Sequence, residues 1–195
     1  MKNIEEKIFA YLAENLSPKR FEHSFNVAKV AVELAGIHGA DTLKAQTAAL
    51  LHDCAKSKTP EELKILFKGR PKIEYFDEIL ENSPDLLHSY ASAVVAEETF
   101  GIKDKDVLNA ISSHTFGRPA MSALEKIIFI ADFVSKDRKH AYAKTAGKTA
   151  KKNPGEALLI VLEKKIEYVL RSRLWICRKT LDTWNYFASG NKNKN

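Results

Sequence analysis

Apolar residues recur at three- and four-residue spacing along most of this chain, which is the pattern of helices that bury one face. The clearest stretch begins at the cap-like pair Ser17-Pro18 and ends at Gly39. Its apolar positions are Phe21, Phe25, Ala28, Val32 and Ala35. This spacing predicts an amphipathic helix over about 17–39.

Similar signals divide the rest of the chain. Thr59-Pro-Glu-Glu62 and Ser122-Ala-Leu-Glu125 are capping boxes, in which side chains satisfy the free N–H groups of a first helical turn. We expect further helices over about 41–55, from 59 onward, and over about 83–101, 104–114, 122–134, 153–170 and 181–188. Alternating runs joined by Asn-Gly or Asp-Gly turns are absent. The sequence predicts an all-α helical bundle of about eight to ten helices, in a single domain over 1–195.

Composition narrows the class of protein. A chain of 195 residues with 45% hydrophobic residues can bury a sizeable core without a disulfide or a zinc staple. Cys54 and Cys177 are far apart and form no C-x-x-C pair. The first seven residues are rich in charge and hold no apolar stretch, unlike a secretory signal. No apolar run in the chain approaches the roughly 18 residues of a membrane span. We expect a cytoplasmic protein with no membrane partner.

The net charge of +6 is concentrated in one place, residues 136–152, here called the basic segment. It holds one acid, Asp137, and seven bases: Lys136, Arg138, Lys139, Lys144, Lys148, Lys151 and Lys152. The rest of the chain has 24 bases and 24 acids. A basic segment is usually a solvated loop, although it can also border a pocket for an anion. The neutral body disfavours nucleic acid as the main partner.

Several ionisable residues interrupt the apolar faces of the expected helices, where an unpaired charge is costly. They are His23, His52, Asp53, His88, His114 and Asp132. Taken singly, His23, His88 and His114 are most simply half-exposed polar residues. For Asp132 and the His52-Asp53 pair, a structural and a functional role are about equally favoured. Together, imidazoles and carboxylates from several helices are what a metal centre in a helical bundle requires. Such ligands suit iron, manganese or zinc.

The order of these residues resembles the HD superfamily of metal-dependent phosphohydrolases. His52-Asp-Cys-Ala-Lys56, Ser83-Pro-Asp-Leu-Leu-His88, His114-Thr-Phe-Gly-Arg-Pro-Ala-Met-Ser122 and Leu124-Glu-Lys-Ile-Ile-Phe-Ile-Ala-Asp132 resemble its YqeK-type branch of symmetrical bis(5'-nucleosyl)-tetraphosphatases. The resemblance is close over about 17–135, which would form the metal core, and looser over about 153–188, the C-terminal helices.

The resemblance implies two metal ions, with iron favoured over manganese or zinc. His23, His52, Asp53 and Asp132 would hold one ion, and Asp53, His88 and His114 the other, with Asp53 bridging. A metal-bound hydroxide would attack phosphorus. The catalytic residues implied are Asp53 and Lys56. Substrate contacts are expected from Lys56, Thr115, Gly117, Arg118 and Arg138.

Each substrate contact has a plainer alternative. Lys56 lies one turn beyond His52 on a continuing helix, where a lysine also suits a helix end. The Gly117-Arg118 pair also fits an ordinary turn, although Arg118 offers a fork of donors matched to phosphate. After Asp132 the family usually has an acidic residue and a proline before a base, whereas this chain has Phe133-Val-Ser-Lys-Asp-Arg138.

The function implied is cleavage of diadenosine tetraphosphate, a dinucleoside polyphosphate, into two ADP. Another nucleotide or phosphate-ester hydrolase of the HD superfamily is the alternative within enzymes. The alternative from another class is an RNA- or ribosome-associated helical factor that uses the basic segment. The sequence leaves the nucleobase preference and a homodimeric state open.

Overall fold

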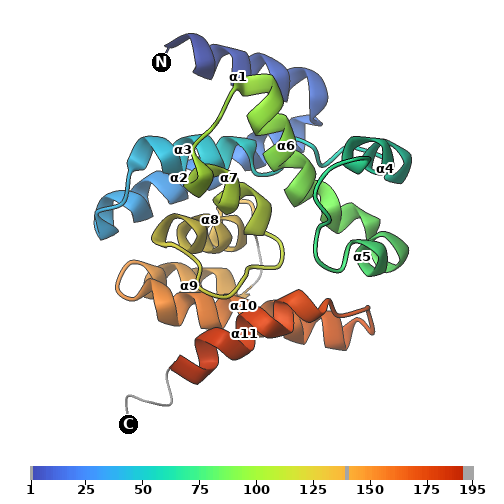
Figure 1. The fold of residues 1–195 in the computed structure, drawn as a ribbon. Helices are drawn as coiled ribbons and strands as arrows, with labels where there is room; N and C mark the ends of the chain where they lie inside the picture. The colour runs from blue at the N-terminus through green and yellow to red at the C-terminus, as the bar shows by residue number, and fades with distance from the viewer. Residues whose placement is uncertain (1, 139–140, 191–195) are drawn as a thin grey trace.

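A computed structural model describes residues 2–138 and 141–190, and that part of the chain is helical with no strand (Figure 1). Its helices are α1 (Lys2–Asn15), α2 (Pro18–His38), α3 (Thr42–Leu51), α4 (Pro60–Phe67), α5 (Phe76–Asn82), a 3-10 helix η1 (Pro84–Leu87), α6 (His88–Phe100), α7 (Lys105–Ser113), α8 (Ala123–Val134), α9 (Ala141–Ala150), α10 (Pro154–Arg171) and α11 (Arg178–Gly190). The expected all-α class is confirmed. None of these helices combines the length and the apolar character needed to cross a membrane.

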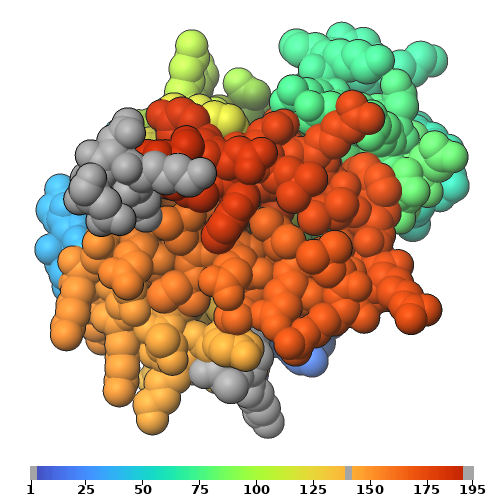
Figure 2. Space-filling view, turned by 90° about the horizontal axis from the view of Figure 1, so that it is seen from below, coloured from blue at the N-terminus to red at the C-terminus, as the bar shows by residue number. Residues whose placement is uncertain are grey.

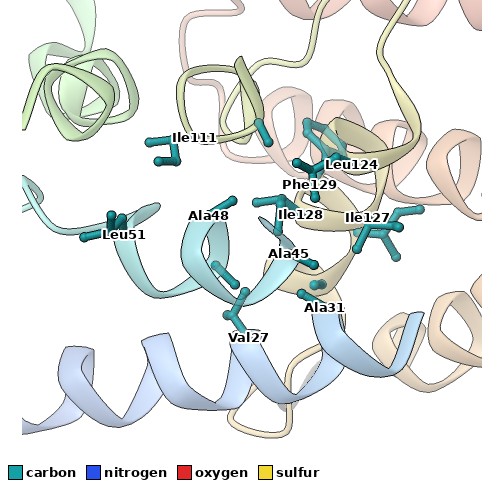
Figure 3. Close-up of a cluster of buried hydrophobic side chains, with 14 of the residues drawn as sticks. Val27, Ala31, Ala45, Ala48, Leu51, Ile111, Leu124, Ile127, Ile128 and Phe129 are labelled. Atoms are coloured by element: carbon teal, nitrogen blue, oxygen red, sulfur yellow. The ribbon is translucent and has the colours of Figure 1, made fainter. Parts of the chain in front are cut away.

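The core lies where α2, α3, α7 and α8 meet (Figure 3). Val27 and Ala31 of α2 face Ala45 and Ala48 of α3, while Ile128 of α8 fills the space beside them. Small side chains let helix axes approach closely, because no branched side chain holds them apart. This contact sets α2 and α3 side by side, which fixes the distance between His23 on α2 and His52 just after α3.

Three helices were not expected from the sequence: α1, α5 and α9. Helix α9 falls in the basic segment, which was interpreted as a loop; residues 139 and 140 of that segment lie outside the described part. The buried residues of α9 are Ala143, Ala146 and Ala150. Alanine contributes little to an apolar pattern, so this buried face was hidden among the lysines. In α1, Ile8 and Leu12 are buried, although the charged start of the chain suggested no element.

The helix that leads to His52 ends earlier than expected. Helix α3 ends at Leu51, and residues 52–57 form turns rather than a continuing helix. The backbone N–H of Cys54 donates to the carbonyl of Leu51, and that of Lys56 to the carbonyl of Asp53. The prediction that Lys56 follows His52 along one continuing helix was therefore wrong, although the turns still bring Lys56 back toward the same group of residues.

Candidate metal centre

The six predicted ligands converge on one buried cluster. His23 lies on α2, His52 and Asp53 follow α3, His88 opens α6, His114 follows α7 and Asp132 lies on α8. The four histidines and Asp53 are each at most 6% exposed. Residues 109 positions apart in the chain, His23 and Asp132, lie in direct contact. The fold thus gathers the ionisable residues that interrupt its apolar helix faces.

Three of the histidines are oriented in the same way. The Nδ1 atoms of His52, His88 and His114 lie 2.6, 2.5 and 2.7 Å from the backbone carbonyl oxygens of Ala49, Asp85 and Ile111, three residues earlier in each case. A carbonyl oxygen can only accept, so Nδ1 carries the proton that it donates. This tautomer leaves each Nε2 atom with a free lone pair, which is the form in which imidazole binds a metal.

The ligand atoms fall into two groups. In the first group, His23 Nε2 lies 3.0 Å from Asp132 Oδ1, and His52 Nε2 lies 4.0 Å from the same oxygen. The second group contains Asp53, His88 and His114. Asp53 Oδ1 lies 2.9 Å from His88 Nε2 and 3.5 Å from His114 Nε2, while Asp53 Oδ2 lies 3.8 Å from His52 Nε2. Asp53 therefore turns one oxygen toward each group.

The donor set fits metal ions. His52 Nε2 is fully buried and has no hydrogen-bond partner, which is costly unless a cation accepts its lone pair. The Nε2 atoms of His88 and His114 lie 3.0 Å apart. Nitrogen ligands at right angles around one ion, with bonds of about 2.1 Å, are separated by about that distance. The donor atoms of His23, His52 and Asp132, and those of His52, Asp53 and His114, each lie within 4.8 Å of one another.

Burial keeps three histidines neutral. It lowers the pKa of His52, His88 and His114 below the ordinary value of 6.5. Burial acts on His23 in the same direction, but contact with Asp132 outweighs it and raises the pKa of His23. Burial alone would raise the pKa of Asp53, but the imidazoles of His52, His114 and His88 that surround its carboxylate hold that pKa well below 3.8. Neutral imidazoles beside ionised carboxylates form a ligand set ready for cations.

Cationic side chains border the cluster, and the sequence predicted two of them. Lys56 Nζ lies 2.9 Å from His88 Nδ1, and Arg138 donates from an Nη atom to Asp132 Oδ1 at 2.6 Å. Arg20, which was not predicted, places an Nη atom 3.5 Å from Asp53 Oδ2. Its position three residues before His23 puts both on the same face of α2, a spacing that could have identified it. These cations suit a site for an anionic group.

Asp137 is a second residue that sequence reasoning missed. Its Oδ2 atom accepts a hydrogen bond from His23 Nδ1 at 2.7 Å. A carboxylate behind a ligating histidine fixes the ring and its tautomer. Asp137 therefore does for His23 what backbone carbonyls do for the other three histidines. No helical spacing marks it, because it lies in the loop after α8.

The substrate contacts predicted just after His114 do not all lie at the cluster. Thr115 Oγ1 lies 3.3 Å from His114 Nε2, at the cluster. Gly117 has φ +70, and a Cβ atom there would lie 2.6 Å from Thr183 Cγ2, so glycine is required by the backbone and by close packing. Arg118 does not contact the cluster: its Nε and one Nη atom donate to the buried carboxylate of Glu125 at 2.6 and 2.7 Å.

Comparison with known proteins agrees with this geometry. The family model described as HD domain matches residues 20–137, a range that includes all six predicted ligands. The chain belongs to the HD-domain family. The helices α9, α10 and α11 lie beyond the matched range.

Relatives of this HD-domain chain cover almost its whole length. The proteins named "Bis(5'-nucleosyl)-tetraphosphatase, symmetrical" from Bacillus subtilis and Halalkalibacterium halodurans are 32% and 37% identical, over 95% and 92% of this chain and 98% and 94% of their own. A crystal structure from Clostridium acetobutylicum, titled a predicted HD superfamily hydrolase involved in NAD metabolism, is 39% identical with a TM-score of 0.89. It covers 95% of this chain and 97% of that one. The similarity to this structure thus extends through the C-terminal helices.

Proposed function

We propose that this chain hydrolyses dinucleoside tetraphosphates symmetrically, so that diadenosine tetraphosphate gives two ADP. The observation that carries the proposal is that relatives bearing this activity in their names match almost the entire chain, while the six ligand types meet in one buried cluster. The cations around the cluster fit the charge of a polyphosphate. Fold alone would not identify a substrate, but a site with this donor set and these cations supports hydrolysis of phosphate esters and anhydrides.

The cluster is proposed to hold two metal ions, with iron favoured. His23, His52 and Asp132 would hold one ion, His88 and His114 the other, and Asp53 both, because its two oxygens face different groups. When bound, such ions lower the pKa of water and offset negative charge on phosphoryl oxygens. The backbone carbonyls and Asp137 orient the four imidazole rings through their Nδ1 atoms.

Lys56 and Arg138 are proposed to contact the phosphate chain from opposite sides. The side chain of Lys56 is 17% exposed beside the second group, and that of Arg138 is 41% exposed beside the first. Burial lowers the pKa of Lys56. A partly desolvated ammonium interacts more strongly with a developing negative charge than a solvated one does. We assign Lys56 to charge that develops during cleavage and Arg138 to holding the phosphate chain.

Thr115, Gly117 and Arg118 are proposed as further substrate contacts. The Thr115 hydroxyl is the nearest of these to a ligand atom. Gly117 lets the backbone approach closely at this point. The guanidinium of Arg118 already serves Glu125 and the carbonyl of Pro119, so any contact with phosphate uses its remaining N–H groups.

Product analysis tests the proposal. Protein loaded in turn with Fe(II), Mn(II) and Zn(II) is incubated with diadenosine tetraphosphate, and the nucleotides are separated. We expect ADP as the only product, and no product from Asp53→Ala treated in the same way. Equal amounts of ATP and AMP would contradict symmetrical cleavage, and equally efficient hydrolysis of a mononucleotide would favour the alternative phosphohydrolase.

A further inference from the structure

A lysine from outside the HD-domain match reaches the loop that carries a predicted metal ligand. Lys165 lies on α10, and its Nζ atom donates to the backbone carbonyls of His114 and Thr115 at 3.2 and 3.1 Å. The same Nζ atom lies 4.0 Å from the ring centroid of Phe129, which is fully buried. Lys165 is half-buried, and an ammonium withdrawn from water is costly unless acceptors surround it. Lys165 thus finds its acceptors in main-chain oxygens and the face of an aromatic ring.

The next carbonyl along the same loop also meets a C-terminal side chain. Thr183 of α11 is fully buried, and its Oγ1 atom lies 3.2 Å from the carbonyl oxygen of Phe116 and 2.8 Å from that of Lys179. Its methyl carbon occupies the space that a side chain at position 117 would need. Helices α10 and α11 therefore touch three consecutive carbonyls, at residues 114, 115 and 116. Figure 2 shows how these orange and red helices cover one face of the molecule.

These contacts lie where helix α7 ends. The last carbonyls of a helix have no partner within it, and the helix end carries partial negative charge. A cation there satisfies the carbonyls and is favoured by the helix dipole. His114 is the residue that follows α7, so the ammonium of Lys165 is bound to the main chain of a predicted ligand.

We propose that Lys165 is a positioning residue for the metal centre: by binding the main chain of His114 and Thr115, it holds His114 Nε2 in place for a metal ion, with Thr183 supporting the same loop. The hydrogen bond from His114 Nδ1 to Ile111 fixes the rotation of the ring, whereas Lys165 fixes the backbone from which the ring projects. This inference rests on the metal centre proposed above and extends it to helices beyond the HD-domain match.

The chain supplies a matched control in the next residue. Lys164 lies on the same helix, but its Nζ atom pairs with Glu163 at 3.0 Å and Glu167 at 2.8 Å, and lies 4.1 Å from the ring centroid of Tyr142. Replacing either lysine removes one charge from α10. Only Lys165→Met removes the donor to the ligand loop, while the methionine chain keeps most of the packing against Phe129.

Metal retention against a chelator measures the effect without any nucleotide. Wild type, Lys165→Met, Lys165→Arg and Lys164→Met are loaded with Mn(II) or Zn(II), titrated with EDTA and analysed for metal, while circular dichroism reports helix content. We expect Lys165→Met to release metal at about tenfold lower chelator concentration, as for loss of a group that orients a ligand. Lys165→Arg should restore much of the retention, and Lys164→Met should match wild type. Thr183→Val should weaken retention by a smaller factor.

Two outcomes would overturn the inference. Lys165→Met could retain metal as wild type does, which would remove any positioning role. Alternatively, it could retain metal while only the turnover number on diadenosine tetraphosphate falls, which would place Lys165 on the substrate. If Lys165→Met loses helix content, Thr183→Val and Lys165→Arg decide the question. Because the chelator assay uses no substrate, its result is independent of whether the protein cleaves a tetraphosphate.

Discussion

The first group of the metal centre contains one histidine, His23, that is oriented by a side chain, whereas His52 and both histidines of the second group are oriented by backbone carbonyls. In the first group, His23 depends on side chains from the loop after α8, because Asp137 binds its Nδ1 atom and Arg138 binds the neighbouring ligand Asp132. In the second group, His88 and His114 donate Nδ1–H to backbone carbonyls within their own turns. A side-chain support can be removed by one substitution, whereas a backbone carbonyl cannot. The first group should therefore be the more sensitive to changes around it.

Asp53 joins the two halves, and its loss should have the largest effect. Asp53→Ala removes the only carboxylate, among the described residues, that turns an oxygen to each group. We expect bound metal to fall for both groups and hydrolysis to drop by about 1,000-fold or more. Elemental analysis and an ADP assay check both effects. Asp132→Ala should leave metal in the second group, and equal metal loss in the two variants would contradict the shared role of Asp53.

Lys56 and Arg138 provide the next comparison, because one borders each group. Lys56→Ala should lower the turnover number by about 100-fold with little change in the Michaelis constant, if it stabilises developing charge. Arg138→Ala should mainly raise the Michaelis constant. Steady-state kinetics on protein of verified metal content separate the two. A reversed pattern would exchange the two assignments.

Substitution of Asp137 tests whether a histidine oriented by a side chain is more sensitive than one oriented by a backbone carbonyl. Asp137→Asn keeps the size of the side chain but weakens the acceptor for His23, and we expect metal affinity to fall about 10-fold in the first group. The control is Asp85→Asn, because His88 uses the backbone carbonyl of Asp85 and not its carboxylate. Chelator titration of each variant gives the affinities. A loss in Asp85→Asn as large as in Asp137→Asn would remove the proposed contrast.

Acidification should affect the histidines of the metal-free protein in opposite directions. Burial lowers the pKa of His52, His88 and His114, so the unfolded chain takes up protons first as pH falls, and stability is lost below about pH 6.5. His23 has a raised pKa because contact with Asp132 outweighs its burial, so its contribution grows on acidification. Urea unfolding at pH 7.5 and 5.5 should show a net loss of stability. His114→Gln should reduce that loss and His23→Gln should increase it.

The basic segment should have the smallest effect. Lys144, Lys148 and Lys151 line a cavity of about 340 Å3 together with Arg138, and Lys151 also pairs with Glu33. Replacing Lys144, Lys148, Lys151 and Lys152 by serine should lower kcat/KM several-fold at low salt, with little change in the turnover number. The difference should vanish as salt rises, because interactions between exposed charges more than about 8 Å apart are largely screened at physiological ionic strength. A difference that persists at high salt would indicate direct contact rather than long-range attraction.

The sequence predicted which ionisable residues gather in the buried cluster, because each one interrupts an apolar pattern of the expected helices. Burial at those positions follows from helical spacing, and a buried ionisable group needs a reason. The sequence did not reveal the roles of Asp137 and Lys165, because those roles depend on tertiary contacts. Asp137 lies in a loop, and Lys165, next to Lys164, resembled part of a solvated charged face. Its spacing from Leu158 and Leu162 on the buried side of α10 was the available indication.

Anomalous X-ray diffraction from crystals of the iron-loaded protein shows whether two metal ions share Asp53. We expect two anomalous peaks. One should lie among His23, His52 and Asp132, the other between His88 and His114, with one oxygen of Asp53 facing each. A single peak, or two peaks of which only one is bound by Asp53, would contradict the sharing of Asp53.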